Sequence, residues 1–106
     1  MPAVSDAKIL IIATDGFEDS ELLEPRRRLL EAGAEIVLAS LDRKEIKGDK
    51  GATITPDTTI GEVDWREFDA LLLPGGTKNP DKLRMEPEVV DTIRAFVQAD
   101  RPVGAI

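Results

Sequence analysis

Two short segments contain the residues whose types and spacing could do chemistry. Residues 14–19, which include Glu18, follow an apolar run at 9–13, and the turn formed by Pro74, Gly75 and Gly76 follows an apolar run at 70–73. Glycines let a backbone approach a ligand closely, so their amides could form an anion or oxyanion site. Taken alone, each segment has a simpler explanation. Glu18 is then a carboxylate favoured by the dipole of a following helix, and the glycines form a turn that ends a strand.

The elements around these segments decide whether they meet. The unbroken apolar runs at 9–13, 70–73 and 103–106 predict buried central strands of a parallel sheet, because such strands are covered on both faces. In open α/β sheets, ligands bind at the carboxyl ends of the strands. We therefore predict that Glu18 and the two glycines converge near the end of the strand at 103–106.

Helices and further strands follow from the same patterns. A helix that starts near Glu18 and ends at Gly33 is favoured by leucines seven residues apart, although Pro25 lies inside it. A second helix opens at Glu86 and Pro87. Residues 35–40 read as a strand, residues 46–55 as a small antiparallel hairpin on the sheet edge, and residues 56–69 as a connecting segment with a helical turn. This order predicts a flavodoxin-like three-layer α/β sandwich with a mainly parallel sheet.

The bulk composition limits the classes of function. The chain has 106 residues, 42% hydrophobic and 33% charged, with a net charge of −7 and neither Cys nor His. Disulfides, thiolate metal sites and histidine catalysis are therefore excluded within the chain as given, and no metal or cofactor site is predicted. The negative charge argues against nucleic acid or an acidic membrane as a partner. No apolar run approaches the ~20 residues of a membrane span, so the expected location is the cytoplasm.

The motifs together resemble a known family. ATDGFEDSEL at 13–22, IKGDKG at 46–51, FDALLLPGG at 68–76 and RPVGAI at 101–106 resemble the ThiJ/PfpI superfamily, nearest its intracellular protease I branch. The resemblance runs from Lys8 to Ile106. In that family the strand that matches Arg101–Ile106 leads directly into a nucleophilic Cys. Chains rarely stop inside a buried strand, so we expect residues 1–106 to be the N-terminal part of a single domain that stops just before the position of this Cys. Either the sequence is a fragment, or it breaks at a non-standard residue such as an oxidised Cys.

The resemblance implies a role for each candidate residue. Glu18 matches the glutamate that hydrogen-bonds the sulfur and tunes its ionisation, and we expect it to be the protonated member of that pair. Gly76, with Gly75 beside it, matches the oxyanion donor. Asp81 matches a carboxylate that reaches a neighbouring subunit's His in the family's homo-oligomers. Here it is Asp rather than Glu, and it follows a turn one residue longer.

Three hypotheses about function remain for comparison. The first is a cysteine-dependent hydrolase-like stress-response enzyme, with peptidase, deglycase or glyoxalase activity on a small carbonyl or peptide substrate. The second is a non-enzymatic redox sensor or chaperone on the same fold. The third, a phosphoryl-accepting domain that uses Asp15, fails because Leu73 and Pro74 occupy the strand end where a second acid is needed.

Overall fold

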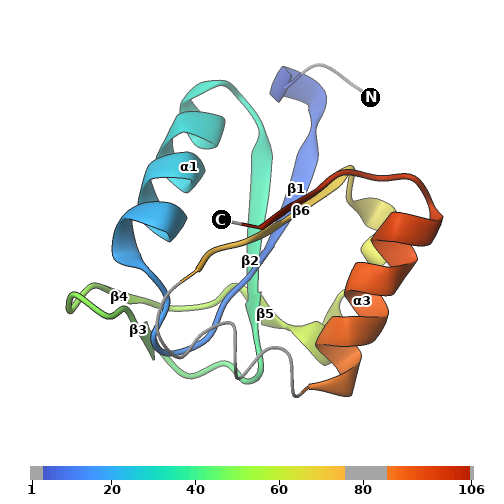
Figure 1. Cartoon of the computed structure of the whole chain (residues 1–106). Coiled ribbons are helices and arrows are strands. Elements are labelled where there is room, and N and C mark those ends of the chain that lie inside the picture. Colours follow the sequence, from blue (N-terminus) through green and yellow to red (C-terminus); the bar gives the residue numbers. More distant parts are fainter. Residues whose placement is uncertain (1–3, 76–85, 106) are drawn as a thin grey trace.

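The computed structural model describes residues 4–75 and 86–105 and shows a five-stranded sheet (Figure 1). The strand order is β5-β2-β1-β6-β7, and every paired neighbour is parallel. The bounds of the five strands are β1 (Lys8–Ile12), β2 (Glu35–Ser40), β5 (Thr58–Thr59), β6 (Ala70–Leu73) and β7 (Val103–Ala105). The predicted α/β architecture with a mainly parallel sheet is confirmed.

Two helices cover opposite faces of this sheet (Figure 1). They are α1 (Asp19–Glu31) and α3 (Pro87–Gln98), and short 3-10 turns lie at η1 (Val4–Asp6), η2 (Ile60–Glu62) and η3 (Trp65–Glu67). Helix α1 continues through Pro25 and is followed by Gly33 at φ +94°, a backbone conformation that favours glycine. The prediction that this helix tolerates its proline is therefore correct. Neither described helix is long and apolar enough to cross a membrane.

The central strand β1 explains why its apolar run does not alternate. Leu10 and Ile12 pack in one cluster with Phe96 of α3, whereas Ile11 packs in another with Leu22 of α1. All five side chains are fully buried. A strand covered on both faces needs apolar residues at every position, so the prediction for 9–13 is confirmed.

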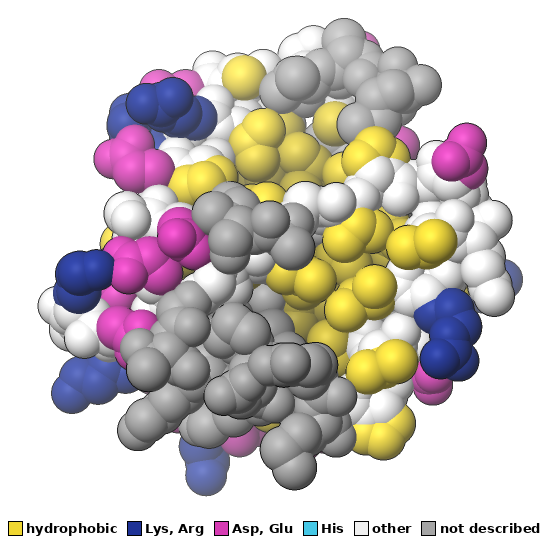
Figure 2. Space-filling model, in the orientation of Figure 1, with side chains coloured by type: hydrophobic (Ala, Val, Ile, Leu, Met, Phe, Trp, Pro, Cys, Tyr) yellow, Lys and Arg dark blue, Asp and Glu magenta, His cyan; other side chains and the backbone are white. Residues whose placement is uncertain are grey.

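The outer strands differ from the sequence-based expectations. β7 is an edge strand: it pairs with β6 on one side, Val103 is half-buried and Gly104 is exposed. The prediction of a buried central strand at 103–106 is therefore wrong for the described part of the chain, because no described strand lies beyond β7. Figure 2 shows hydrophobic side chains gathered on the viewed face, where a hollow between α1 and β6 is lined by Pro25, Leu29 and Leu72.

The hairpin is confirmed, but it does not extend the sheet. β3 (Ile46–Lys47) and β4 (Thr53–Ile54) form a separate antiparallel pair. The strand at that edge of the main sheet is β5, which the sequence placed in a connecting segment. The hairpin instead lies against the loop that joins β1 to α1, where its backbone hydrogen-bonds that loop. It therefore belongs to the end of the sheet at which the candidate residues lie.

Candidate functional site

The loop after β1 turns sharply so that Phe17 enters the core and Glu18 starts the helix. Gly16 has φ +83°, and its N–H donates to the Lys47 carbonyl at 2.8 Å. A positive φ is open to glycine at little cost. Phe17 is fully buried, which anchors the loop. Glu18 is the N-cap residue of α1 but makes no side-chain capping hydrogen bond, so its carboxylate is available to other partners.

Two hydrogen bonds join this loop to the turn after β6. The Glu18 N–H donates to the Gly75 carbonyl at 2.7 Å, and the Gly75 N–H donates to Glu21 Oε1 at 2.9 Å. The structure thus brings Glu18 and Gly75 together, as the sequence predicts. Ala105 pairs with Leu73, so the described end of β7 lies at the same edge of the sheet. The other two candidates, Gly76 and Asp81, lie outside the described residues.

The position of Glu21 changes the interpretation of the glycine turn. Because the N–H of Gly75 already donates to the Glu21 carboxylate, it is engaged in this structure rather than directed at a ligand. Sequence reasoning missed this role for Glu21. The only signal was its position one helical turn after Glu18, on the same side of the helix start.

The Glu18 carboxylate is paired with a cation from the hairpin. Lys50 Nζ lies 2.9 Å from Oε1 and 2.7 Å from Oε2, and Ser20 Oγ donates to Oε1 at 3.2 Å. The hydrogen bond from Lys50 holds the pKa of Glu18 below its usual range, against a smaller opposing effect of desolvation. The same pair raises the pKa of Lys50. The expectation that Glu18 is the protonated member of a carboxyl–thiol pair concerns a cysteine that residues 1–106 do not contain, so it stays a prediction.

A second acidic side chain fixes the backbone of the hairpin turn. Asp19 Oδ1 accepts from the Lys50 N–H at 3.1 Å, and Oδ2 accepts from the Ala52 N–H at 2.9 Å. The Asp49 N–H donates to the Phe17 carbonyl at 2.9 Å. The turn carrying Lys50 is therefore held to the β1–α1 loop through its main chain as well as through its ammonium group.

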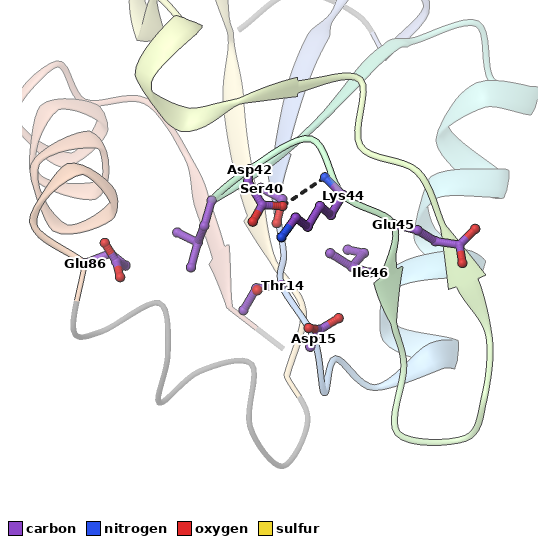
Figure 3. Close-up of a pocket in the computed structure, with 9 residues that line it drawn as sticks. Thr14, Asp15, Ser40, Asp42, Lys44, Glu45, Ile46 and Glu86 are labelled. Atoms are coloured by element: carbon purple, nitrogen blue, oxygen red, sulfur yellow. Dashed lines mark hydrogen bonds between the residues drawn. The ribbon is translucent and has the colours of Figure 1, made fainter.

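A separate cavity of ≈ 430 Å³ opens at the carboxyl ends of β1 and β2 (Figure 3). Its lining includes the hydroxyl side chains of Thr14 and Ser40 and the charged side chains of Asp15, Asp42, Lys44, Glu45 and Glu86. Neither Glu18 nor Gly75 lines it. Among the described residues, no group of three or more acidic side chains is arranged to hold a metal ion.

Comparison with known proteins assigns the fold to a family. A model of the DJ-1/PfpI family matches residues 7–106. The chain belongs to this family. Among curated relatives, Deglycase TK1284 of Thermococcus kodakarensis is 41% identical over 99 residues, 93% of this chain and 59% of its own length. Protein/nucleic acid deglycase 2 of Escherichia coli is 46% identical over 101 residues, 93% and 58% of the two lengths. General stress protein 18 of Bacillus subtilis is 42% identical over 101 residues, with the same coverage.

Solved structures of DJ-1/PfpI proteins share the fold. A two-domain protein from Anabaena variabilis with DJ-1/ThiJ/PfpI-like and ferritin-like domains matches with a TM-score of 0.90 at 31% identity, covering 94% of this chain and 29% of that one. Oxidized DJ-1 of Toxoplasma gondii matches with a TM-score of 0.88 at 23% identity, covering 94% and 55%, and supports the fold alone. The chain spans about 58–59% of the length of the curated relatives named above.

Proposed function

We propose that the whole protein is a cysteine-dependent hydrolase-type enzyme of the DJ-1/PfpI family, acting as a deglycase on small carbonyl adducts or on glycated peptides. The observation that carries the proposal is the junction of Glu18 with the Gly75 turn at the sheet edge where β7 ends. Relatives named deglycases over nearly the whole of this chain support the same class of reaction.

The proposed nucleophile is a cysteine that follows Ile106 in the whole protein. Its thiolate would attack a carbonyl carbon, forming the C–S bond while the carbonyl π electrons move to oxygen. An amide of the glycine turn would stabilise the resulting oxyanion. Because the Gly75 N–H donates to Glu21, this role falls to the amide of Gly76. Glu18 would lie beside the sulfur and govern the protonation of the thiol.

The test measures how fast the full-length protein turns over a hemithioacetal formed from methylglyoxal and a small thiol. The reaction is monitored by the disappearance of this adduct. Replacing the proposed cysteine with Ser should abolish turnover. Glu18→Leu should lower kcat/KM by about 10²-fold, the lower end for a group that handles protons, and Glu18→Gln should lower it less. Glu24→Gln is the matched control, since Glu24 pairs with Arg27 on the exposed side of α1.

The possible outcomes separate the proposed enzyme from the alternative. Turnover in Glu18→Leu equal to that of the unaltered protein would leave Glu18 as no more than a helix-start carboxylate. A protein that turns over no carbonyl substrate, yet has a thiol readily oxidised by peroxide, would be a redox sensor on this fold. The proposal also includes a homo-oligomer in which Asp81 reaches a neighbouring subunit, and a monomer in light scattering would exclude that role.

A further inference from the structure

The hairpin turn at residues 48–51 places one cation against the candidate site. Lys50 Nζ contacts both oxygens of the Glu18 carboxylate, at 2.9 and 2.7 Å. The Glu18 side chain is only 21% exposed, whereas that of Lys50 is 69% exposed. The ammonium group therefore covers the part of the Glu18 carboxylate that the rest of the protein leaves exposed.

The turn is built to keep this lysine in place. Gly48 packs so closely on the loop that an added Cβ would lie 1.9 Å from Asp19 Oδ1 and 2.9 Å from Phe17 Cε2. Asp19 accepts from the main chain on both sides of Gly51. A surface ion pair is usually weak because two long side chains must be ordered to form it. Here the Glu18 side chain is mostly covered and the backbone of Lys50 is fixed by other bonds, so the cost that remains is the ordering of the Lys50 side chain.

We propose that Lys50 is a positioning residue of this site, which holds the Glu18 carboxylate beside the Gly75 turn and keeps it charged. The inference deepens the proposed function and rests on it for the consequence for catalysis. Lys50 acts through Glu18, so it is distinct from the groups that contact a substrate.

The surrounding charges support this assignment. Asp19 and Asp49 add to the effect of Glu18 in raising the pKa of Lys50, so the lysine stays protonated across the physiological range. Glu21 is occupied by the Gly75 N–H, and Ser20 donates a neutral hydrogen bond to Glu18. Among the described residues, Lys50 is the cation that pairs with the Glu18 carboxylate.

The consequence for a thiol beside Glu18 is one of charge balance. An ionised carboxylate opposes a neighbouring thiolate, and a nearby ammonium group offsets that repulsion. Removing the Lys50 ammonium group should therefore raise both apparent pKa values of a coupled carboxyl–thiol pair. Lys50 would thus move the working range of the enzyme toward lower pH.

The direct test is a ¹³C NMR titration of the Glu18 carboxyl in the full-length protein, with the signal assigned by its loss in Glu18→Gln. Lys50→Met should raise the pKa of Glu18, and Lys50→Arg should keep it low because the cation is retained. Lys47→Met is the matched control: it removes the same charge from the same hairpin, and Lys47 has no role in the low pKa of Glu18. High salt should shrink the difference between Lys50→Met and the unaltered protein, because the Debye length falls to ~3 Å at 1 M.

The titration can either support or overturn the role of Lys50. An unchanged Glu18 titration in Lys50→Met, or an equal shift in Lys47→Met, would overturn the proposal. Its catalytic part is tested by the pH profile of kcat/KM, whose acid limb should move to higher pH in Lys50→Met and return in Lys50→Arg. A full-length protein with no turnover in any variant would end the proposed function, while the carboxyl titration would still decide the role of Lys50.

Discussion

Replacing Gly48 with alanine should release the hairpin from the β1–α1 loop. The added Cβ would lie 1.9 Å from Asp19 Oδ1, 2.7 Å from its Cγ and 2.9 Å from Phe17 Cε2. Heavy atoms cannot approach so closely. Phe17 is fully buried and has little room to move, so the hairpin backbone must shift away from the loop and the Asp19 carboxylate must rotate away. It then loses its hydrogen bonds to the N–H groups of Lys50 and Ala52.

The size of the effect follows from these two bonds. A hydrogen bond to a charged group contributes about 1.5–3 kcal/mol. Taking the low end for each bond because the hairpin is partly exposed, Gly48→Ala should lower the free energy of unfolding by about 3 kcal/mol. Gly51 gives a contrasting control. An added Cβ there meets nothing within 4 Å, and its φ of +95° is the only obstacle. Gly51→Ala should therefore cost only about 1–2 kcal/mol.

The assay is urea unfolding followed by circular dichroism, arranged as a double-mutant cycle with Asp19→Ala. If Gly48→Ala acts by displacing Asp19, most of its effect should disappear once Asp19 is absent, giving an interaction energy of about 2 kcal/mol. Effects that add to within about 0.5 kcal/mol would refute the reasoning, because they would place the cost elsewhere in the hairpin.

Three further predictions concern the stability of the protein in acid, the packing of its core and the hydrogen bonds of Arg101. Because Lys50 lowers the pKa of Glu18, their pairing stabilises the fold fully above the ordinary carboxyl value of 4.5 and loses its effect as the pH falls through the lower folded value. Lys50→Met should flatten this acid limb in a plot of Tm against pH, and an identical limb would contradict the pairing. Phe96→Ala should lower the free energy of unfolding in urea by about 3–5 kcal/mol. Val97 is 63% exposed, so Val97→Ala should change it by less than about 0.5 kcal/mol. Equal losses would contradict the burial of Phe96 in the core. Arg101 Nη1 donates to main-chain carbonyls at 2.6 and 2.9 Å, and the guanidinium lies over the Trp65 ring. Arg101→Lys, which lacks this planar group, should cost about 1–2 kcal/mol, and no loss would show that these contacts are replaceable.

Local sequence patterns were sufficient for the parts of the fold that depend on burial. The run at 9–13 predicts β1 because a strand covered on both faces tolerates no polar residue. The convergence of Glu18 with Gly75 could also be predicted, because parallel strands present their carboxyl ends at one edge. Both predictions use rules that need no knowledge of distant contacts.

The contacts that define the Glu18 environment could not be predicted in the same way. Lys50 reaches Glu18 from 32 residues further along the chain, through a hairpin whose place is decided by Asp19 and by main-chain bonds. Nothing in the glycine spacing indicates that this hairpin lies over the loop rather than on the sheet edge. The two-residue strand β5 was missed because so short a segment shows no periodicity.

The hydrogen bonds that join β1 and the β1–α1 loop to the segment around β6 link residues far apart in the sequence. They imply an order of assembly. Lys8 pairs with Glu35 in β2, but 61 residues separate it from its hydrogen-bond partner Asp69, which directly precedes β6. Closing the longer loop costs about 0.6 kcal/mol more for each doubling of its length, so β1, α1 and β2 should associate before β6 docks. Pulse-labelled hydrogen exchange should then protect the Gly75 amide after that of Leu38, and simultaneous protection would contradict this order. A chain emerging from the ribosome would accordingly hold a nearly complete β1–α1–β2 unit while Glu18 still lacked its Gly75 partner.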